Sequence, residues 1–436
     1  MINKLLLLFF VTILNIKAQT PYSSYFTGDT TNVINPTQYR LCLMGGATED
    51  DNAMKWFLNG SGGGDIVVIR VTGTSGYNTY LFSGLGISVN SVETIVIPSI
   101  AAANNSYVKR RLREAEAVFI AGGNQNDYAT LWKNTQVDSA LNYLINVKKV
   151  PIGGTSAGMM IQGQAYFTAS VSSITSSVAL ANPYGTGVTI GNNDFLHHTI
   201  LKRVITDTHY DNPDRHGRQS TFLARLFQDS ARAFYGIACD EYTAICIDST
   251  GVAKVFGGYP TYDDNAYFIQ PNCALPNIPE NCNTGQSLTW NRNNEALKVY
   301  AGKGTSVGAS CFDLKNWQNP NATGGTWQNW FIVNGTFSIT TNATPLNCIT
   351  TVVNNITTAN DEFILYPNPT TGIINFSIHN STLSKLSIKN ILGQVVYQST
   401  IQNLQSLINL SNFPPGIYFF ELHNQQTTYT KKIIKN

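Results

Sequence analysis

Charged side chains are scarce in this chain of 436 residues: Asp, Glu, Lys and Arg make up 12%, about half the usual share in soluble domains. The formal net charge is +2, and no run of Lys or Arg is long enough to indicate a nucleic-acid partner or an acidic membrane surface. Hydrophobic residues make up 43%, which is enough for packed cores. The length suggests two or three domains, and a surface rich in Asn, Thr, Ser and Tyr is common in extracellular proteins.

Several cofactor motifs are also missing. No C-x-x-C pair occurs, which argues against a zinc ribbon or a thiol redox site. There is no Walker pattern, and Gly45-Gly46 is not a G-x-G-x-x-G fingerprint. His197, His198 and His209 lack the spacing of metal ligands such as H-E-x-x-H. The sequence therefore gives little support for a nucleotide or metal site.

One apolar run stands out, and it lies at the start of the chain. It follows Lys4, extends from Leu5 to Leu14 and is followed by the small residue Ala18. This pattern predicts a secretory signal peptide over residues 1–18, and the run is too short to span a bilayer comfortably. No other segment approaches transmembrane length, so we expect an exported protein.

The seven cysteines fit an exported protein, because export permits disulfides. Cys273 and Cys282 flank a loop rich in Pro and Asn and are one candidate pair, and Cys311 and Cys348 are a second. Cys42 lies in an apolar strand and is expected to be a buried thiol. The odd total leaves at least one free thiol, and the sequence leaves the pairing open.

Strands and helices alternate from about residue 38 to 160. Strands are expected at 40–44, 65–71, 93–97, 117–121 and 150–153, and helices at 52–58, 77–85, 106–116 and 137–147. This alternation predicts an α/β fold with a doubly wound, mostly parallel sheet. Sites in such sheets lie outside the carboxyl ends of the strands, where Gly45-Gly46, Gly122-Gly123 and residues 154–158 all fall.

Gly154-Thr155-Ser156-Ala157-Gly158 has the pattern of a nucleophile elbow. An apolar run precedes it and Met159-Met160-Ile161 begins a predicted helix, so a serine would project from a tight turn between strand and helix. The pattern alone is weak, because Gly and Ser are common in turns. Its setting favours Ser156 as a nucleophile over a plain turn residue.

A serine nucleophile needs a base and an acid that orients the base. His209 is the best-placed base, because it follows the strand-like residues 203–208, and a hydrogen-bonded structural histidine is the other interpretation. Asp240 and Glu241 lie between two apolar runs. In an extended segment they point to opposite sides, so one of them can serve as the acid, and a capped turn is the alternative.

These pieces together resemble the cyanophycinase and aspartyl-dipeptidase family of serine peptidases, the S51 group, from about residue 40 to 255. The matching segments are Gly45-Gly46 with Glu49-Asp50, Gly122-Gly123-Asn124-Gln125, residues 153–158, Asp207-Thr208-His209-Tyr210 and residues 236–244. The resemblance implies a doubly wound fold like that of class I glutamine amidotransferases. It also implies Ser156 as nucleophile, His209 as base and Glu241 as orienting acid.

The resemblance further implies an oxyanion hole and a substrate-binding set. The amides of Gly123 and Ala157 would hold the oxyanion, and Gln125, Asp207, Arg215 and Arg218 would bind substrate. The family's Asp-Gln-His-Phe motif is changed here, because Thr208 replaces Gln and Tyr210 replaces Phe. Pro213 stands at the first of the three arginine positions that follow, so the substrate site is only partly retained.

The implied activity is serine-type peptide hydrolysis through an acyl-enzyme, without a metal or an organic cofactor. The implied substrate is cyanophycin, multi-L-arginyl-poly-L-aspartate, which cyanophycinases cut to β-Asp-Arg dipeptides. Small Asp-containing peptides are the alternative substrate. A surface protein that binds without cutting is an alternative function, and a homodimer remains open.

The composition and the pattern of predicted elements change along the rest of the chain. Residues 19–255 form the predicted catalytic domain, residues 256–345 an extension packed on it or a ligand-binding surface, and residues 346–360 a linker. Residues 361–436 show short alternating strands, typical of a small β-sandwich. Tyr366-Pro367-Asn368-Pro369 and Gly416-x-Tyr418 in this segment resemble the C-terminal sorting domain of type IX secretion cargo. That resemblance implies export through the periplasm to the cell surface or the medium, and an adhesive domain is the alternative.

Overall fold

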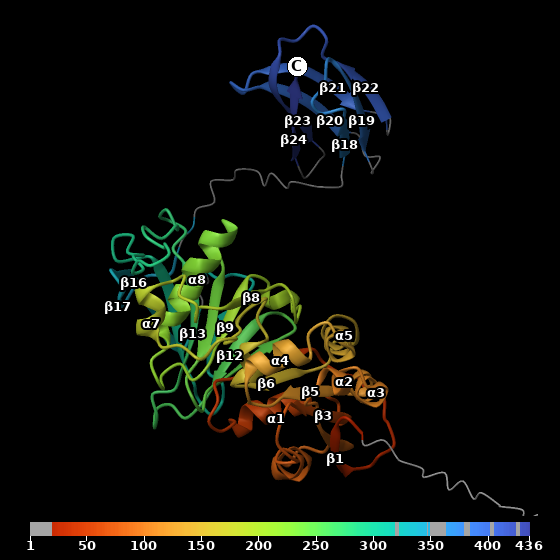
Figure 1. The fold of residues 1–436 in the computed structure, drawn as a ribbon, viewed down its shortest axis with the longest axis vertical. Helices are drawn as coiled ribbons and strands as arrows, with labels where there is room; N and C mark the ends of the chain where they lie inside the picture. Colours follow the sequence, from red (N-terminus) through yellow and green to blue (C-terminus); the bar gives the residue numbers. More distant parts are fainter. Residues whose placement is uncertain are drawn as a thin grey trace, which may run out of the picture. The chain divides into compact units, whose positions relative to one another are not determined.

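The computed structural model describes residues 20–318, 322–346, 348, 363–378, 384–401, 405–423 and 428–436. The predicted signal peptide and most of the predicted linker lie outside these residues. The chain divides into two compact units, Met1–Cys348 and Ile349–Asn436, which are described separately (Figure 1). In the described part of the chain, no helix is long and apolar enough to cross a membrane.

A nine-stranded sheet forms the first half of the larger unit (Figure 1). Its order is β1 (Ser23–Gly28), β4 (Ser91–Val96), β3 (Asp65–Arg70), β5 (Ala117–Ile120), β6 (Ile152–Thr155), β2 (Arg40–Met44), β11 (Ala244–Asp248), β12 (Val252–Phe256) and β15 (Ser310–Asp313). The inner strands from β4 to β2 are parallel, and the strands at both edges are antiparallel.

Helices cover both faces of this parallel core. On one face, Val67 and Ile69 of β3 pack in a cluster with α3 (Ser106–Glu114) and α5 (Gln136–Tyr143). On the other face, Ile66 and Val68 pack with α1 (Asp51–Asn59). Successive residues of a strand point to opposite faces, so one continuous apolar run serves both layers. The remaining short helices of this half are η1 (Tyr80–Gly84), α2 (Ile100–Ala103), α4 (Gln125–Leu131), η2 (Leu144–Lys148) and α6 (Ala157–Met160).

An eight-stranded sheet forms the second half of the unit. Its order is β17 (Thr336–Thr341), β16 (Gly325–Val333), β14 (Leu297–Lys303), β13 (Asn265–Pro271), β10 (Tyr235–Cys239), β9 (Val204–Asp207), β7 (Ala165–Phe167) and β8 (Ile190–Asn192). Only the pairs of β9 with β7 and β10 are parallel among these. The helices here are α7 (Ser176–Ala181), η3 (Thr199–Leu201) and α8 (His216–Ser230).

The expectation of one mostly parallel sheet is therefore corrected to two mixed sheets. The segment after residue 256, expected as an extension, supplies β13, β14, β16 and β17, which pair antiparallel in succession. It also supplies β15 to the first sheet. Antiparallel pairing needs no crossover helix between the paired strands, so the described residues of this segment extend the sheets without helices.

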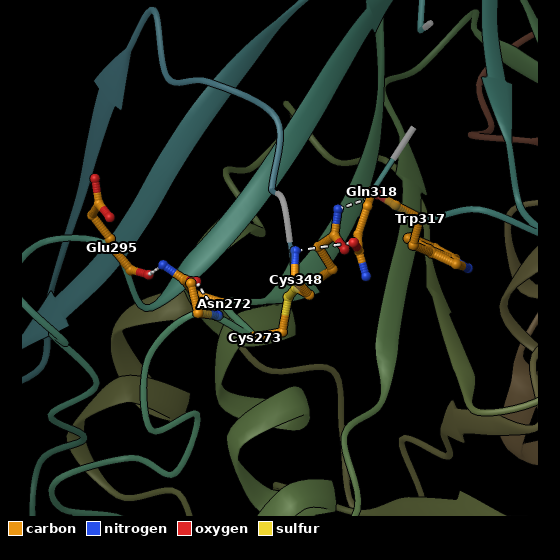
Figure 2. Close-up of a disulfide and its surroundings, with 8 residues drawn as sticks. Asn272, Cys273, Glu295, Trp317, Gln318 and Cys348 are labelled. Atoms are coloured by element: carbon orange, nitrogen blue, oxygen red, sulfur yellow. Dashed lines mark hydrogen bonds between the residues drawn. A yellow bond between two sulfur atoms is a disulfide. The ribbon is translucent and has the colours of Figure 1, made fainter. Parts of the chain in front are cut away.

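The disulfide of the described residues joins Cys273 to Cys348, with 5.7 Å between their Cα atoms (Figure 2). Both expected pairs were wrong, because Cys282 is a buried free thiol and Cys311 is a partly exposed one. The Cys348 amide donates to Gln318 Oε1 at 3.0 Å, and Figure 2 shows the two residues beside the disulfide. The bond fixes the end of this unit beside the end of β13, a contact that sequence spacing does not reveal.

Replacing Cys273 by serine is expected to destabilise the larger unit by about 4 kcal/mol. The disulfide closes a loop with a sequence separation of 75, and the loop-closure model gives a loss of this size for such a length. Urea unfolding of the wild type and Cys273→Ser, each with and without dithiothreitol, measures the effect. Dithiothreitol should lower the stability of the wild type and leave the variant unchanged. An equal response of both proteins would contradict the assignment.

The smaller unit contains two sheets around one core (Figure 1). The first is β18 (Phe363–Tyr366), β19 (Ile373–Ile378) and β22 (Gln405–Asn409), and the second is β21 (Val395–Ile401), β20 (Ser384–Asn390), β23 (Gly416–His423) and β24 (Thr428–Lys435). Ile374 and Ile408 from the first sheet share a buried cluster with Leu386, Ile388 and Phe420 from the second. The unit is therefore all-β with a core between its sheets.

Candidate active site

Ser156 lies on a tight turn directly after β6, in a backbone conformation that few non-glycine residues adopt. Its φ is 52° and its ψ is −118°, and its amide donates to the Met44 carbonyl oxygen at 3.1 Å. The flanking glycines are required, because a Cβ on Gly154 would lie 2.3 Å from the Gly158 oxygen and one on Gly158 would lie 2.0 Å from the Ile120 oxygen. The helix that follows, α6, is a single turn that ends at Met160, shorter than the sequence pattern suggested.

His209 reaches Ser156 from the second sheet. It follows the end of β9, and its amide donates to the Gly45 carbonyl oxygen at 2.8 Å. Its Nε2 lies 2.8 Å from Ser156 Oγ, and its Nδ1 lies 2.6 Å from Glu241 Oε1. The three side chains therefore form one continuous hydrogen-bonded chain, assembled from the ends of β6, β9 and β10.

Glu241, rather than Asp240, contacts the histidine. The Glu241 amide donates to Asp211 Oδ1 at 3.0 Å, and Asn212 Nδ2 donates to Glu241 Oε2 at 3.4 Å. Asp240 points elsewhere, because its Oδ2 accepts from the Asn265 amide at 3.0 Å. Asp211 and Asn212 hold the acid in place but were not singled out from the sequence. The available signal was their position two and three residues after His209.

Ser156 opens into a pocket of about 440 Å³ that Gly123, Gln125, Ala157 and His209 also line. Ala157 is the first residue of α6, so its amide has no acceptor within that helix. Gly123 lies in the turn before α4, close to Tyr128: a Cβ at Gly123 would meet the Tyr128 hydroxyl at 2.7 Å. Both predicted oxyanion-hole residues are therefore at the pocket beside Ser156. The segment from Ala169 to Ser173 also lines this pocket.

The predicted substrate-binding residues divide into two groups. Gln125 and Arg215 line the pocket, and Arg215 Nη1 donates to the Thr208 carbonyl oxygen at 2.8 Å. Arg215 Nε is buried without a partner among the described residues, and burial, followed by the nearby Arg218, lowers the pKa of Arg215 to about 10. A partly buried cation with an unused donor among the described residues is suited to an anionic substrate group.

Asp207 and Arg218 have a different place from the one expected. Arg218 Nε donates to Asp207 Oδ2 at 2.9 Å and Nη2 to Asp207 Oδ1 at 2.5 Å. Asp207 is 0% exposed and is absent from the pocket lining, and Arg218, 1% exposed, lines it with its guanidinium already paired. The prediction that Asp207 binds substrate is therefore corrected, because both of its carboxylate oxygens bind Arg218 and the residue does not line the pocket.

His198 does not compete for the role of base. Its ring nitrogens lie 2.8 Å from the Tyr39 hydroxyl and 2.8 Å from Gln162 Oε1, and the side chain is buried. Burial lowers the pKa of His198 to about 3, so its imidazole stays neutral near pH 7. His198 is therefore a buried, hydrogen-bonded structural histidine.

Gly46 sets the position of the His209 ring, a role that the sequence did not assign. A Cβ at Gly46 would lie 2.3 Å from His209 Cε1 and Nε2, and the Gly46 φ is 114°. Gly46→Ala is therefore expected to displace the imidazole and to lower kcat/KM about 100-fold, since small misplacements of reacting groups have effects of this size.

A peptidase assay and a thermal melt of Gly46→Ala test this expectation. Gly76→Ala is the matched control, because a Cβ at Gly76 would meet nothing within 4 Å. Wild-type activity in a folded Gly46→Ala protein would show that the position of the His209 ring is unimportant.

A serine, a histidine and a carboxylate linked in this order at strand ends are the arrangement of a serine hydrolase. Residues 77–255 match the model of peptidase family S51, and residues 364–436 match the model of the secretion system C-terminal sorting domain. Residues 77–255 thus match a family of serine-type peptidases, and a later segment matches a sorting domain. The sorting domain indicates secretion by the type IX system to the cell surface or the extracellular space.

Individual relatives match parts of the chain. Cyanophycinases of Synechococcus elongatus and Thermosynechococcus vestitus are each 26% identical over 175 residues, which cover 39% of this chain and 48% of theirs. The chain thus spans about half the length of these relatives. An ulvan lyase of Nonlabens ulvanivorans is 35% identical over 74 residues, 16% of this chain and 14% of that protein. The structure of a peptidase from an acI-B1 actinobacterium aligns with a TM-score of 0.36 at 13% identity, covering 51% of this chain and 89% of that one.

Proposed function

We propose that this protein is a secreted serine-type exopeptidase with Ser156 as nucleophile, His209 as general base and Glu241 as orienting acid. The observation that carries the proposal is the unbroken chain from Ser156 Oγ through His209 to Glu241, with distances of 2.8 and 2.6 Å. These distances lie within hydrogen-bond reach, as a nucleophile and its base require. The S51 match over residues 77–255, which includes all three residues, supports it.

The proposed reaction is acyl transfer. His209 takes the proton of Ser156 as Oγ attacks the substrate carbonyl carbon, and the amides of Gly123 and Ala157 bind the oxyanion. His209 then protonates the leaving amine, and the Ser156 acyl ester remains. Water, activated by His209, hydrolyses this ester and restores the free serine. Glu241 stabilises the imidazolium that forms in each step.

We propose a cyanophycin-type polymer as substrate, with release of β-Asp-Arg dipeptides. The S51 match and the two cyanophycinase relatives support this choice. Arg215 would bind a substrate carboxylate, with Gln125 beside it in the pocket. Small Asp-containing peptides are the second candidate, favoured by the pairing of Arg218 with Asp207, which leaves one cation at the pocket for the substrate.

A substrate panel tests the function. The full chain and its Ser156→Ala variant would be incubated with insoluble cyanophycin and with Asp-initiated dipeptides of α and β linkage, and the products identified by mass spectrometry. Release of β-Asp-Arg by the wild type alone supports the cyanophycinase assignment. Cleavage of dipeptides alone moves the substrate to small peptides. No turnover by the folded wild type would contradict peptidase function and favour a binding protein.

We also propose a fold type, a partner for the last domain and an oligomeric state. A doubly wound architecture like that of class I glutamine amidotransferases is supported by the parallel core with helices on both faces. The last domain, residues 361–436, would contact the type IX secretion machinery, as its sorting-domain match suggests. A homodimer is a further proposal, which the mass of the protein in solution tests.

A further inference from the structure

A second cavity, of about 940 Å³, lies next to the His209–Glu241 pair and shares no lining residue with the Ser156 pocket. Asp211, two residues after His209, and Tyr242, directly after Glu241, belong to its wall. The wall is strongly acidic: it includes residues 49–51, Asp211, Asp240, Asp263 and Asp264, seven carboxylates in all, and no Lys, Arg or His. The cavity is therefore a concentrated negative site beside the proposed reaction centre.

Positive charge does not balance these carboxylates. Glu49 accepts from the Tyr77 hydroxyl at 2.5 Å and Asp51 from the Tyr80 hydroxyl at 2.9 Å, which are neutral donors. Asp50 caps α1 through the Ala53 amide. At the rim, Lys303 forms an ion pair with Asp263. Hydrogen bonds thus hold the carboxylates in place, but most of their charge has no cationic partner within the described residues.

Asp240 gives an independent sign of a missing partner. It is 3% exposed, and its Oδ1 has no hydrogen-bond partner among the described residues. Burial, followed by the neighbouring Asp211, raises the pKa of Asp240 to about 7. A buried carboxylate oxygen without a donor is costly, so a ligand that supplies a charged donor would be favoured there.

The aromatic wall indicates which kind of cation fits. Tyr242 and Tyr262 line the cavity at 55% and 67% exposure, and Tyr267 lines it as well. Tyrosine faces attract guanidinium and ammonium groups. Within the described residues, no group of three His, Cys, Asp or Glu side chains is arranged to hold a metal ion. An organic cation therefore matches the wall better than a metal ion.

We infer that this acidic cavity is a substrate subsite for the guanidinium or ammonium side chain of an arginine or lysine in the peptide. It rests on the proposed peptidase function, because a subsite needs the adjacent reaction centre. The peptide would then contact two cavities with opposite preferences: Arg215 faces an anionic group in one, and the carboxylates face a cationic group in the other. Substrates with both charges near the scissile bond would be selected.

Calorimetric titration of the full-length Ser156→Ala protein tests the subsite without any need for turnover. The probe is Nα-acetyl-arginine amide, and Nα-acetyl-citrulline amide is its neutral analogue of the same shape. The arginine probe should bind at least about tenfold more tightly than the citrulline probe. In the same background, Asp240→Asn and Tyr262→Ala should each weaken binding about fivefold to tenfold.

Asp229→Asn is the control, because Asp229 lies in α8, pairs with Arg225 and does not line the cavity. Tyr262→Ala removes an exposed side chain, so it keeps the test valid if Asp240→Asn fails to fold. Equal binding of the two probes, or binding that neither variant weakens, would overturn the inference. Displacement of the arginine probe by stoichiometric Ca²⁺ would also overturn it. Arginine binding by a wild type that cleaves nothing would reject the peptidase function and leave a cation site.

Discussion

Replacement of Ser156 by alanine is expected to lower kcat by about 10⁴-fold or more, because a residue of a catalytic triad acts as part of a unit. The variant keeps the pocket, Gly123 and Ala157, so its KM should change little. Alanine lacks Oγ, which removes the hydrogen bond to His209 and the atom that attacks the carbonyl. Initial rates on the substrate identified in the panel measure the effect.

His209→Ala and the double variant Ser156→Ala/His209→Ala test whether the two residues act as one unit. Because the two residues act together, the double variant should be about as slow as either single variant. Multiplicative losses would show that Ser156 and His209 act independently, which the hydrogen bond between them argues against. A Ser156→Ala protein with wild-type rates would remove the serine from the mechanism.

Asp207→Asn is expected to destabilise the larger unit by about 3–5 kcal/mol, because it leaves the buried Arg218 guanidinium without its counter-charge. Both oxygens of Asp207 bind Arg218, and Oδ1 also accepts from the Thr208 amide at 2.8 Å. The change lies next to the segment that carries His209, so activity should fall together with stability. Urea unfolding followed by tryptophan fluorescence measures the loss.

Two further variants separate this pair from an ordinary surface ion pair. Asp229→Asn removes an exposed partner of Arg225, 3.1 Å away, and should cost less than about 0.5 kcal/mol. The double variant Asp207→Asn/Arg218→Met removes both charges and should be more stable than Asp207→Asn alone. If Asp207→Asn lost as little stability as Asp229→Asn, the result would contradict the buried pairing of Asp207 with Arg218.

The sequence predicted the parallel strands of the first sheet because they bury apolar side chains in simple patterns, but it did not predict the edge strands β1, β12 and β15. The strand expected at 40–44 has the bounds of β2, Arg40–Met44, and the continuous apolar run at β3 reflects helices on both faces. The sequence did not predict α8, because its buried face carries polar residues such as Arg218, Gln219 and Thr221. Their partners, among them Asp207 and the carbonyl oxygens of β9 and β10, come from distant segments.

The difference between local sequence patterns and contacts with distant segments also explains which site residues were predicted. Ser156 and His209 were predicted because each follows a strand-like segment, whereas the choice of Glu241 over Asp240 came from the family resemblance; the structure brings the three side chains together. Asp207 was assigned to the substrate because its neighbours fit a motif. Its partner Arg218 lies eleven residues away, in the first turn of α8, a helix that the sequence pattern did not predict. The pairing of Cys273 with Cys348 likewise depends on where two sheet segments meet.

The central claim is that His209 and Glu241 activate Ser156, and a fluorophosphonate probe that reacts with activated serines tests it most directly. The full-length wild type, Ser156→Ala and His209→Ala would be treated with the probe and digested, and the labelled peptide identified by mass spectrometry. The account predicts one adduct on the wild-type peptide that contains Ser156, and none in either variant. A folded wild type without an adduct, or a label that persists in Ser156→Ala, would contradict it.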